Sequence, residues 1–104
     1  MNIHLVFEAS LLQALKPALQ ENGYTVSGVD MTLEQFRIAA EAGNIEADIV
    51  LVDGSLGIRR QESVQLLKET QLYAPELRLI VILSTDDVGW VRELGLLGIY
   101  DVLL

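Results

Sequence analysis

The sequence predicts an α/β fold in which helices cover both faces of a five-stranded parallel sheet. Five apolar runs alternate with longer amphipathic stretches along the 104 residues. Two of the runs, residues 49–52 (IVLV) and 79–83 (LIVIL), are continuously apolar, which is typical of central strands buried on both faces. Strands and helices that alternate at this spacing form right-handed crossovers, and these produce one doubly wound sheet.

The other three apolar runs predict the remaining strands, over residues 3–7, 24–29 and 99–104. The run over residues 24–29 (YTVSGV) is more polar than the others, which suits the edge of the sheet. The last run coincides with the end of the sequence, so no covering helix follows it. We therefore expect four helices, with the fifth helix missing.

The first two helices are predicted from their capping residues. Ser10 is the expected N-cap of a leucine-rich helix, and Pro17 inside that helix removes one backbone hydrogen bond and predicts a kink. Thr32, followed three residues later by Gln35, forms the pattern of a capping box for the second helix.

The last two helices are predicted from periodicity. The third covers residues 60–73, with Val64, Leu67 and Leu72 facing the core. The fourth begins near Asp86 or Asp87, and it is the weakest because it contains two glycines.

The charge balance excludes several classes of partner. The chain has 7 Lys and Arg against 15 Asp and Glu, a formal net charge of −8, and no cysteine. Phosphate binding requires clustered Lys and Arg, and anionic membranes repel an acidic chain, so we expect neither nucleic acid nor a membrane as partner. Disulfides and thiolate chemistry are excluded. No spanning segment or signal peptide is present, and a cytoplasmic location is the default expectation.

The loops after the strands are where a doubly wound sheet carries its function. Glu8 follows the first predicted strand and Asp53 the third, while Ser84, Asp86 and Asp87 follow the fourth. Clustered carboxylates of this kind suit Mg²⁺, and an Asp beside Mg²⁺ can act as a nucleophile towards phosphorus. The alternative is an Asp that caps or solvates a loop after a buried strand, and spacing alone favours this alternative.

No enzyme active site is visible in the sequence. The first strand-to-helix turn, FEASLLQ, contains no glycine, and a Walker A motif is absent, so no phosphate cradle is expected. His4 has no partner at ligand spacing and is expected to be a satisfied or partly exposed strand histidine. Without a nucleophile–base pair or a cofactor cradle, we expect a protein that is not an enzyme.

Three stretches of the sequence resemble parts of one family. Residues 47–53 (ADIVLVD) are similar to a PDLVLLD strand that ends in a phosphorylated Asp, residues 79–85 (LIVILST) to the fourth strand, and residues 98–103 (GIYDVL) to a GAxDYL entry to the fifth. The whole chain resembles the CheY-like receiver domains of two-component response regulators. This resemblance implies the flavodoxin-like strand order 2-1-3-4-5, Asp53 as phosphoacceptor and Ser84 as the residue that contacts the phosphoryl group.

The resemblance to receiver domains is incomplete. Receivers carry two adjacent acidic residues after the first strand that hold Mg²⁺, and here these positions are Phe7 and Glu8. Glu8 and Asp53 are thus the remaining metal ligands, and Mg²⁺ binding is expected to be weak or absent. The family's usual Pro after the phosphoacceptor is Gly57, and its aromatic switch position is Val102.

The resemblance implies a receiver-like signal-transduction domain whose partner is a histidine kinase or another signalling protein. The alternative is a phosphorylation-independent pseudo-receiver that serves protein–protein interaction or localisation, since the ending LGIYDVLL resembles the N-terminal domain of ParA/MinD-like pilus-assembly ATPases. We expect residues 1–104 to be the N-terminal domain of a longer protein. A homodimer through the fourth helix and fifth strand, or through the uncovered sheet face, is also expected.

Overall fold

The computed structural model describes residues 1–56, 59–82 and 102–103. They form one parallel sheet with strand order β2-β1-β3-β4-β5, which confirms the predicted architecture. The strands are β1 (Asn2–Val6), β2 (Thr25–Asp30), β3 (Ile49–Asp53), β4 (Leu79–Ile82) and β5 (Val102–Leu103). The helices are α1 (Ala9–Glu21), α2 (Leu33–Glu41) and α3 (Arg60–Tyr73), with a 3-10 turn, η1 (Gly54–Leu56), directly after β3.

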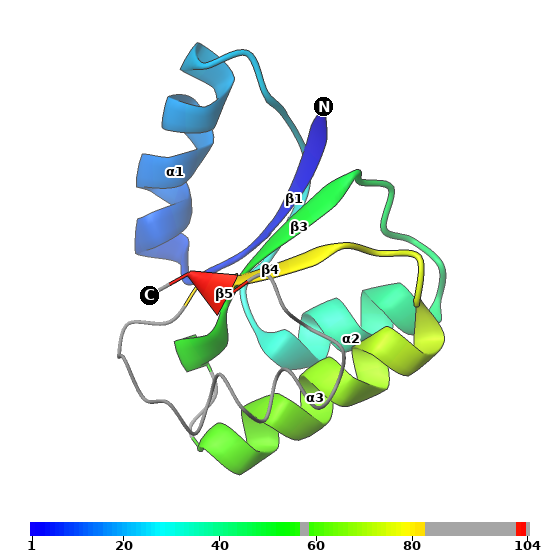
Figure 1. Ribbon diagram of the computed structural model, residues 1–104. Helices are drawn as coiled ribbons and strands as arrows, with labels where there is room; N and C mark the ends of the chain where they lie inside the picture. The colour runs from blue at the N-terminus through cyan, green and yellow to red at the C-terminus, as the bar shows by residue number, and fades with distance from the viewer. Residues whose placement is uncertain (57–58, 83–101, 104) are drawn as a thin grey trace.

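The helices form two layers around the sheet. Figure 1 shows α1 on one face and the neighbouring helices α2 and α3 on the other. The predicted fourth helix lies outside the described residues. None of the helices in the described part of the chain is long and apolar enough to cross a membrane.

The face under α2 and α3 holds the larger part of the core. Successive side chains of a strand point to opposite faces, so Val50 and Val52 of β3 face these two helices together with Val81 of β4. All three are fully buried against Phe36 of α2 and Leu67 of α3. The continuous apolar runs of β3 and β4 are predicted to be buried on both faces, and on this face their side chains are fully or almost fully buried.

The face under α1 is covered less completely. Ile3, Leu5 and Phe7 are buried there, but Leu51 of β3 and Ile82 of β4 are only partly buried. The helix itself contains no buried residue, because its apolar stripe is half-buried and the flanking positions are exposed. The second hydrophobic layer is thus thin.

The expected cap of the first helix is wrong. Glu8 is the N-cap residue, and Ser10 lies inside the first turn, where its hydroxyl donates a 2.7 Å hydrogen bond to Glu8 Oε1. The second helix confirms its prediction, since Thr32 Oγ1 accepts from the Gln35 backbone N–H at 3.0 Å. The Gln35 side chain accepts from the backbone N–H of Met31, one residue before the cap.

The third helix has the predicted bounds but a different buried face. Its buried positions include Ser63, Leu67 and Thr70, whereas Leu72 is 73% exposed, so the expectation that Leu72 faces the core is wrong. A helix turns 100° per residue, which places Leu72 about 140° away from Leu67 around the axis. Thr70 is accommodated because its hydroxyl donates to the Leu66 carbonyl at 2.8 Å.

His4 joins β1 to β2 and α2 through a buried polar contact. Its Nε2 lies 2.8 Å from Asp30 Oδ2, and its ring stacks on Phe36 with centroids 5.8 Å apart. The β1–β2 register shifts here from Ile3 opposite Val26 to His4 opposite Gly28, which identifies a β-bulge. A Cβ on Gly28 would lie 2.8 Å from His4 Nδ1, so glycine is required at this close approach. The expectation of a satisfied strand histidine is confirmed.

Phe36 provides the first stability prediction. We expect Phe36→Ala to lower the free energy of unfolding by about 3–5 kcal/mol, because it leaves a cavity in the larger core layer. Ile38→Ala in the same helix is the matched control, since Ile38 is 52% exposed and its truncation should cost at most about 0.5 kcal/mol. Urea unfolding measures both, and equal losses would contradict this description of the core.

Gly28 provides the second stability prediction. We expect Gly28→Ala to destabilise the chain by about 1–2 kcal/mol, because overpacking against the His4 ring outweighs the reduced entropy of the unfolded chain. The neighbouring variant Ser27→Ala is the control and should cost less, about 0.5 kcal/mol, since the exposed Ser27 side chain donates only a long 3.4 Å hydrogen bond to the Ile3 carbonyl. Urea unfolding, together with the ring-proton shifts of His4, tests this expectation. A Gly28→Ala variant as stable as the wild type would show that the contact is not tight.

Candidate functional site

The candidate site lies where β1 and β3 end. Asp53 is the last residue of β3, and Glu8 follows β1 by two residues as the N-cap of α1. The two strands are neighbours in a parallel pair, so their carboxyl ends lie at the same edge of the sheet. The structure therefore brings the two predicted ligand positions to one edge.

The register of this pair determines what lies next to Asp53. Val6 is opposite Val52, and continuing the register by one residue places Phe7 opposite Asp53. On the other side, Asp53 is opposite Ile82 of β4. In-register neighbours point to the same face, so the half-buried Asp53 stands between two apolar positions of the α1 face. Phe7 is only 4% exposed, and its ring belongs to the core.

Glu8 is placed by the start of α1. Its carbonyl accepts the first backbone bond of the helix, from the Leu12 N–H at 3.0 Å. Its side chain is exposed, and Oε1 already accepts the 2.7 Å hydrogen bond from the Ser10 hydroxyl. The carboxylate is thus engaged with the first turn of its own helix.

These residues fit a divalent cation poorly. Across residues 1–56, 59–82 and 102–103, no three His, Cys, Asp or Glu side chains lie close enough to hold a metal ion. Mg²⁺ requires near-octahedral oxygen ligation, and here an apolar ring occupies the register position beside Asp53. Ser84, Asp86 and Asp87, the expected contributors from the loop after β4, lie outside the described residues.

One acidic residue at this edge was not anticipated. Asp30 ends β2, next to β1, and its carboxylate contacts His4 rather than a ligand. In the sequence, this contact is indicated only by an Asp at the end of an edge strand and a His in the adjacent strand. Their contact spans 26 positions in the chain and depends on the bulge, which spacing arguments do not reveal.

Comparison with known proteins adds the family context of the fold. No protein-family model matches the sequence, and no curated protein matches it. Among solved structures, the isolated receiver domain of RcsB from Salmonella enterica serovar Typhimurium, determined with the phosphomimetic BeF3−, matches with a TM-score of 0.80 at 18% identity. The match covers 100% of this chain and 76% of that one.

Two further structures show the same fold. The signal receiver domain of a modulated diguanylate cyclase from Desulfovibrio desulfuricans is 25% identical, with a TM-score of 0.76, covering 98% of this chain and 79% of that one. The pilus assembly protein CpaE from Caulobacter crescentus is 20% identical, with a TM-score of 0.73 and the same two coverages of 98% and 79%. The chain therefore has the fold of response-regulator receiver domains, a fold that it shares with a pilus assembly protein.

Proposed function

We propose that this chain is a receiver-like signal-transduction domain with Asp53 as its phosphoacceptor. One observation carries the proposal: Asp53 is the half-buried last residue of the central strand β3 in a 2-1-3-4-5 parallel sheet. Doubly wound sheets bind their ligands at this edge. The fold shared with receiver domains supports the same assignment.

The chemistry requires only a carboxylate and a phosphodonor. An oxygen of the Asp53 carboxylate attacks the phosphorus of a phosphohistidine or a small phosphodonor, forming an acyl phosphate. The bond from phosphorus to the donor breaks, and its electron pair remains with the donor. The acyl phosphate carries about 1.5 to 2 negative charges where the carboxylate carried one, and it adds bulk at the sheet edge, which would bias the neighbouring loops. Asp53 and Glu8 are the two residues that we expect to attract a cation, and since the described residues contain no group of three possible metal ligands, Mg²⁺ would be held weakly.

A second candidate function is favoured by Phe7. An apolar ring at the register position beside Asp53 disfavours the charge that phosphorylation and metal binding bring. The chain would then be a pseudo-receiver that binds a partner protein without phosphorylation, and the fold shared with a pilus assembly protein is consistent with this role. In either case we propose a protein partner, a kinase in the first and an assembly partner or second copy in the second.

Beryllofluoride separates the two candidates. With BeF3− and millimolar Mg²⁺, we expect amide shifts in a ¹⁵N NMR spectrum to concentrate at Asp53 and the η1 turn that follows, because BeF3− mimics the acyl phosphate there. Asp53→Asn should abolish these shifts. Asp48→Asn is the matched control and should retain them, since exposed Asp48 precedes the opposite end of β3.

Two results would overturn the phosphoacceptor assignment. Shifts that persist in Asp53→Asn would place the reactive carboxylate elsewhere. An unchanged spectrum, together with no mass gain from acetyl phosphate, would eliminate phosphorylation and leave the pseudo-receiver as the function.

A further inference from the structure

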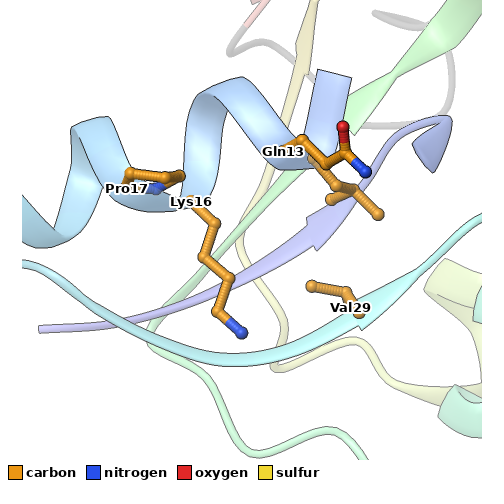
Figure 2. A pocket seen from close by; sticks show the side chains of 5 residues that line it. Gln13, Lys16, Pro17 and Val29 are labelled. Carbon is orange, nitrogen blue, oxygen red and sulfur yellow. The ribbon is translucent and has the colours of Figure 1, made fainter. Parts of the chain in front are cut away.

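A groove separates α1 from the edge strand β2, away from Asp53. It has a volume of about 330 Å³ and is lined by Leu12, Gln13, Lys16 and Pro17 of α1 and Val29 of β2 (Figure 2). Val29 is 44% exposed although it is apolar. The volume lies at the small end of the range for ligand pockets, which runs from about 300 to 1,000 Å³. The groove is therefore mainly apolar, with one ammonium group, that of Lys16, at its wall.

The β2 edge offers backbone hydrogen-bonding groups beside this groove. The Asp30 carbonyl accepts from the Phe7 N–H, so the backbone of Asp30 faces β1, and the N–H and C=O of Val29 face away from it. β2 is the edge of the sheet, and in the described part of the chain no strand lies on its outer side. Such unpaired groups are a template for an added strand.

The bulge in β2 brings the Val29 side chain to the groove. Ser27 is the extra residue between Val26, opposite Ile3, and Gly28, opposite His4. Because of this extra residue, Val26 and Val29 both reach the α1 face although they are three positions apart. The same shift leaves only the last part of β2 regular enough to pair with another strand.

Two features of α1 lie at the groove, a proline and a lysine. Proline has no N–H, so Pro17 leaves the Gln13 carbonyl without its α-helical donor, and both residues line the groove. Lys16 makes no ion pair with any residue in the described ranges, and Figure 2 shows its side chain extending from α1 towards β2. The groove thus presents an ammonium donor at its wall, and the outward-facing N–H and C=O of Val29 lie beside it.

We propose that this groove binds an extended peptide segment of a partner protein, which adds a strand to the edge of β2. The segment pairs with the N–H and C=O of Val29, and its side chain next to Val29 enters the groove, because in-register neighbours share a face. A carboxylate on the segment contacts the Lys16 ammonium. The inference does not depend on phosphorylation of Asp53.

Charge distinguishes this occupant from a second copy of the chain. Two copies carrying −8 each repel one another, and the groove contributes a single cation to offset that repulsion. For the same reason the segment carries one carboxylate rather than an acidic run. The competing explanation is that the Lys16 stem merely covers Val29 and Leu12 while its ammonium stays in water.

The test is an NMR titration of the ¹⁵N-labelled chain with the capped peptide Thr-Val-Leu-Thr-Asp-Thr, in which Leu and Asp are two positions apart and therefore share a face. We expect shifts at Val29 and at Leu12 and Gln13 of the groove. Lys16→Glu should weaken binding about threefold to tenfold, because an attractive surface pair becomes repulsive. Lys68→Glu makes the same charge change on the exposed surface of α3 and should leave the affinity within about twofold.

A backbone variant tests strand addition itself. Val29→Pro removes an N–H that faces away from β1, so the sheet should keep its fold while peptide binding is lost. Far-UV circular dichroism checks the fold, and a peptide N-methylated at its Leu should lose binding to the wild type.

Three outcomes would overturn the proposal. The first is the absence of groove shifts at millimolar peptide. The second is equal weakening by Lys16→Glu and Lys68→Glu, which would indicate general charge repulsion. The third is that the amide shifts of the groove residues change with the concentration of the chain in the absence of peptide, which would make a second copy the occupant.

Discussion

The parallel register between β1 and β3 is the constraint on which the rest of the structure depends. It places Ile3 opposite Ile49 and Val6 opposite Val52, at the centre of the sheet. The same register determines that Phe7, a core residue, is the neighbour of Asp53. A slip by one residue would turn the buried side chains of β1 to the wrong face, so packing and site composition are fixed together.

The two faces of the sheet are covered unequally, and this asymmetry separates their roles. The face under α2 and α3 buries large side chains completely, and Arg37 of α2 contacts Glu69 of α3 at 3.5 Å across the helix pair. The face under α1 is half-buried, because a single described helix covers it. The residues that stabilise the fold are therefore concentrated on the face under α2 and α3. The groove beside β2 and the Asp53 side chain with its strand neighbours lie on the face under α1.

The fold could be predicted from the sequence because its signals are local. The continuous run that forms β3, and the periodic segment that forms α3, lie within the windows that patterning detects. One error was local, and one contact that patterning did not show depends on distant residues. Ser10 was assigned as a cap, but Glu8 precedes the helix and takes the hydroxyl of Ser10 instead. The contact of His4 with Asp30 depends on a bulge that no local pattern shows.

The candidate site could be predicted only in part. Asp53 and Glu8 were located because both follow apolar strands, and the replacement of an acidic position by Phe7 was visible in the resemblance to receivers. The groove between α1 and β2 was not anticipated, since it requires the bulge, the edge position of β2 and Pro17 together. None of these three features alone indicates a binding surface, which depends on their arrangement in space.

The most direct measurement compares the Mg²⁺ affinity of the wild type with that of Phe7→Asp. The amide shift of Asp53 in an NMR titration reports the binding. If the apolar neighbour of Asp53 is what weakens the metal site, the added carboxylate should tighten Mg²⁺ binding at least about tenfold, while Phe7→Leu leaves the affinity unchanged. Equal affinities for the wild type and a folded Phe7→Asp variant would contradict the account.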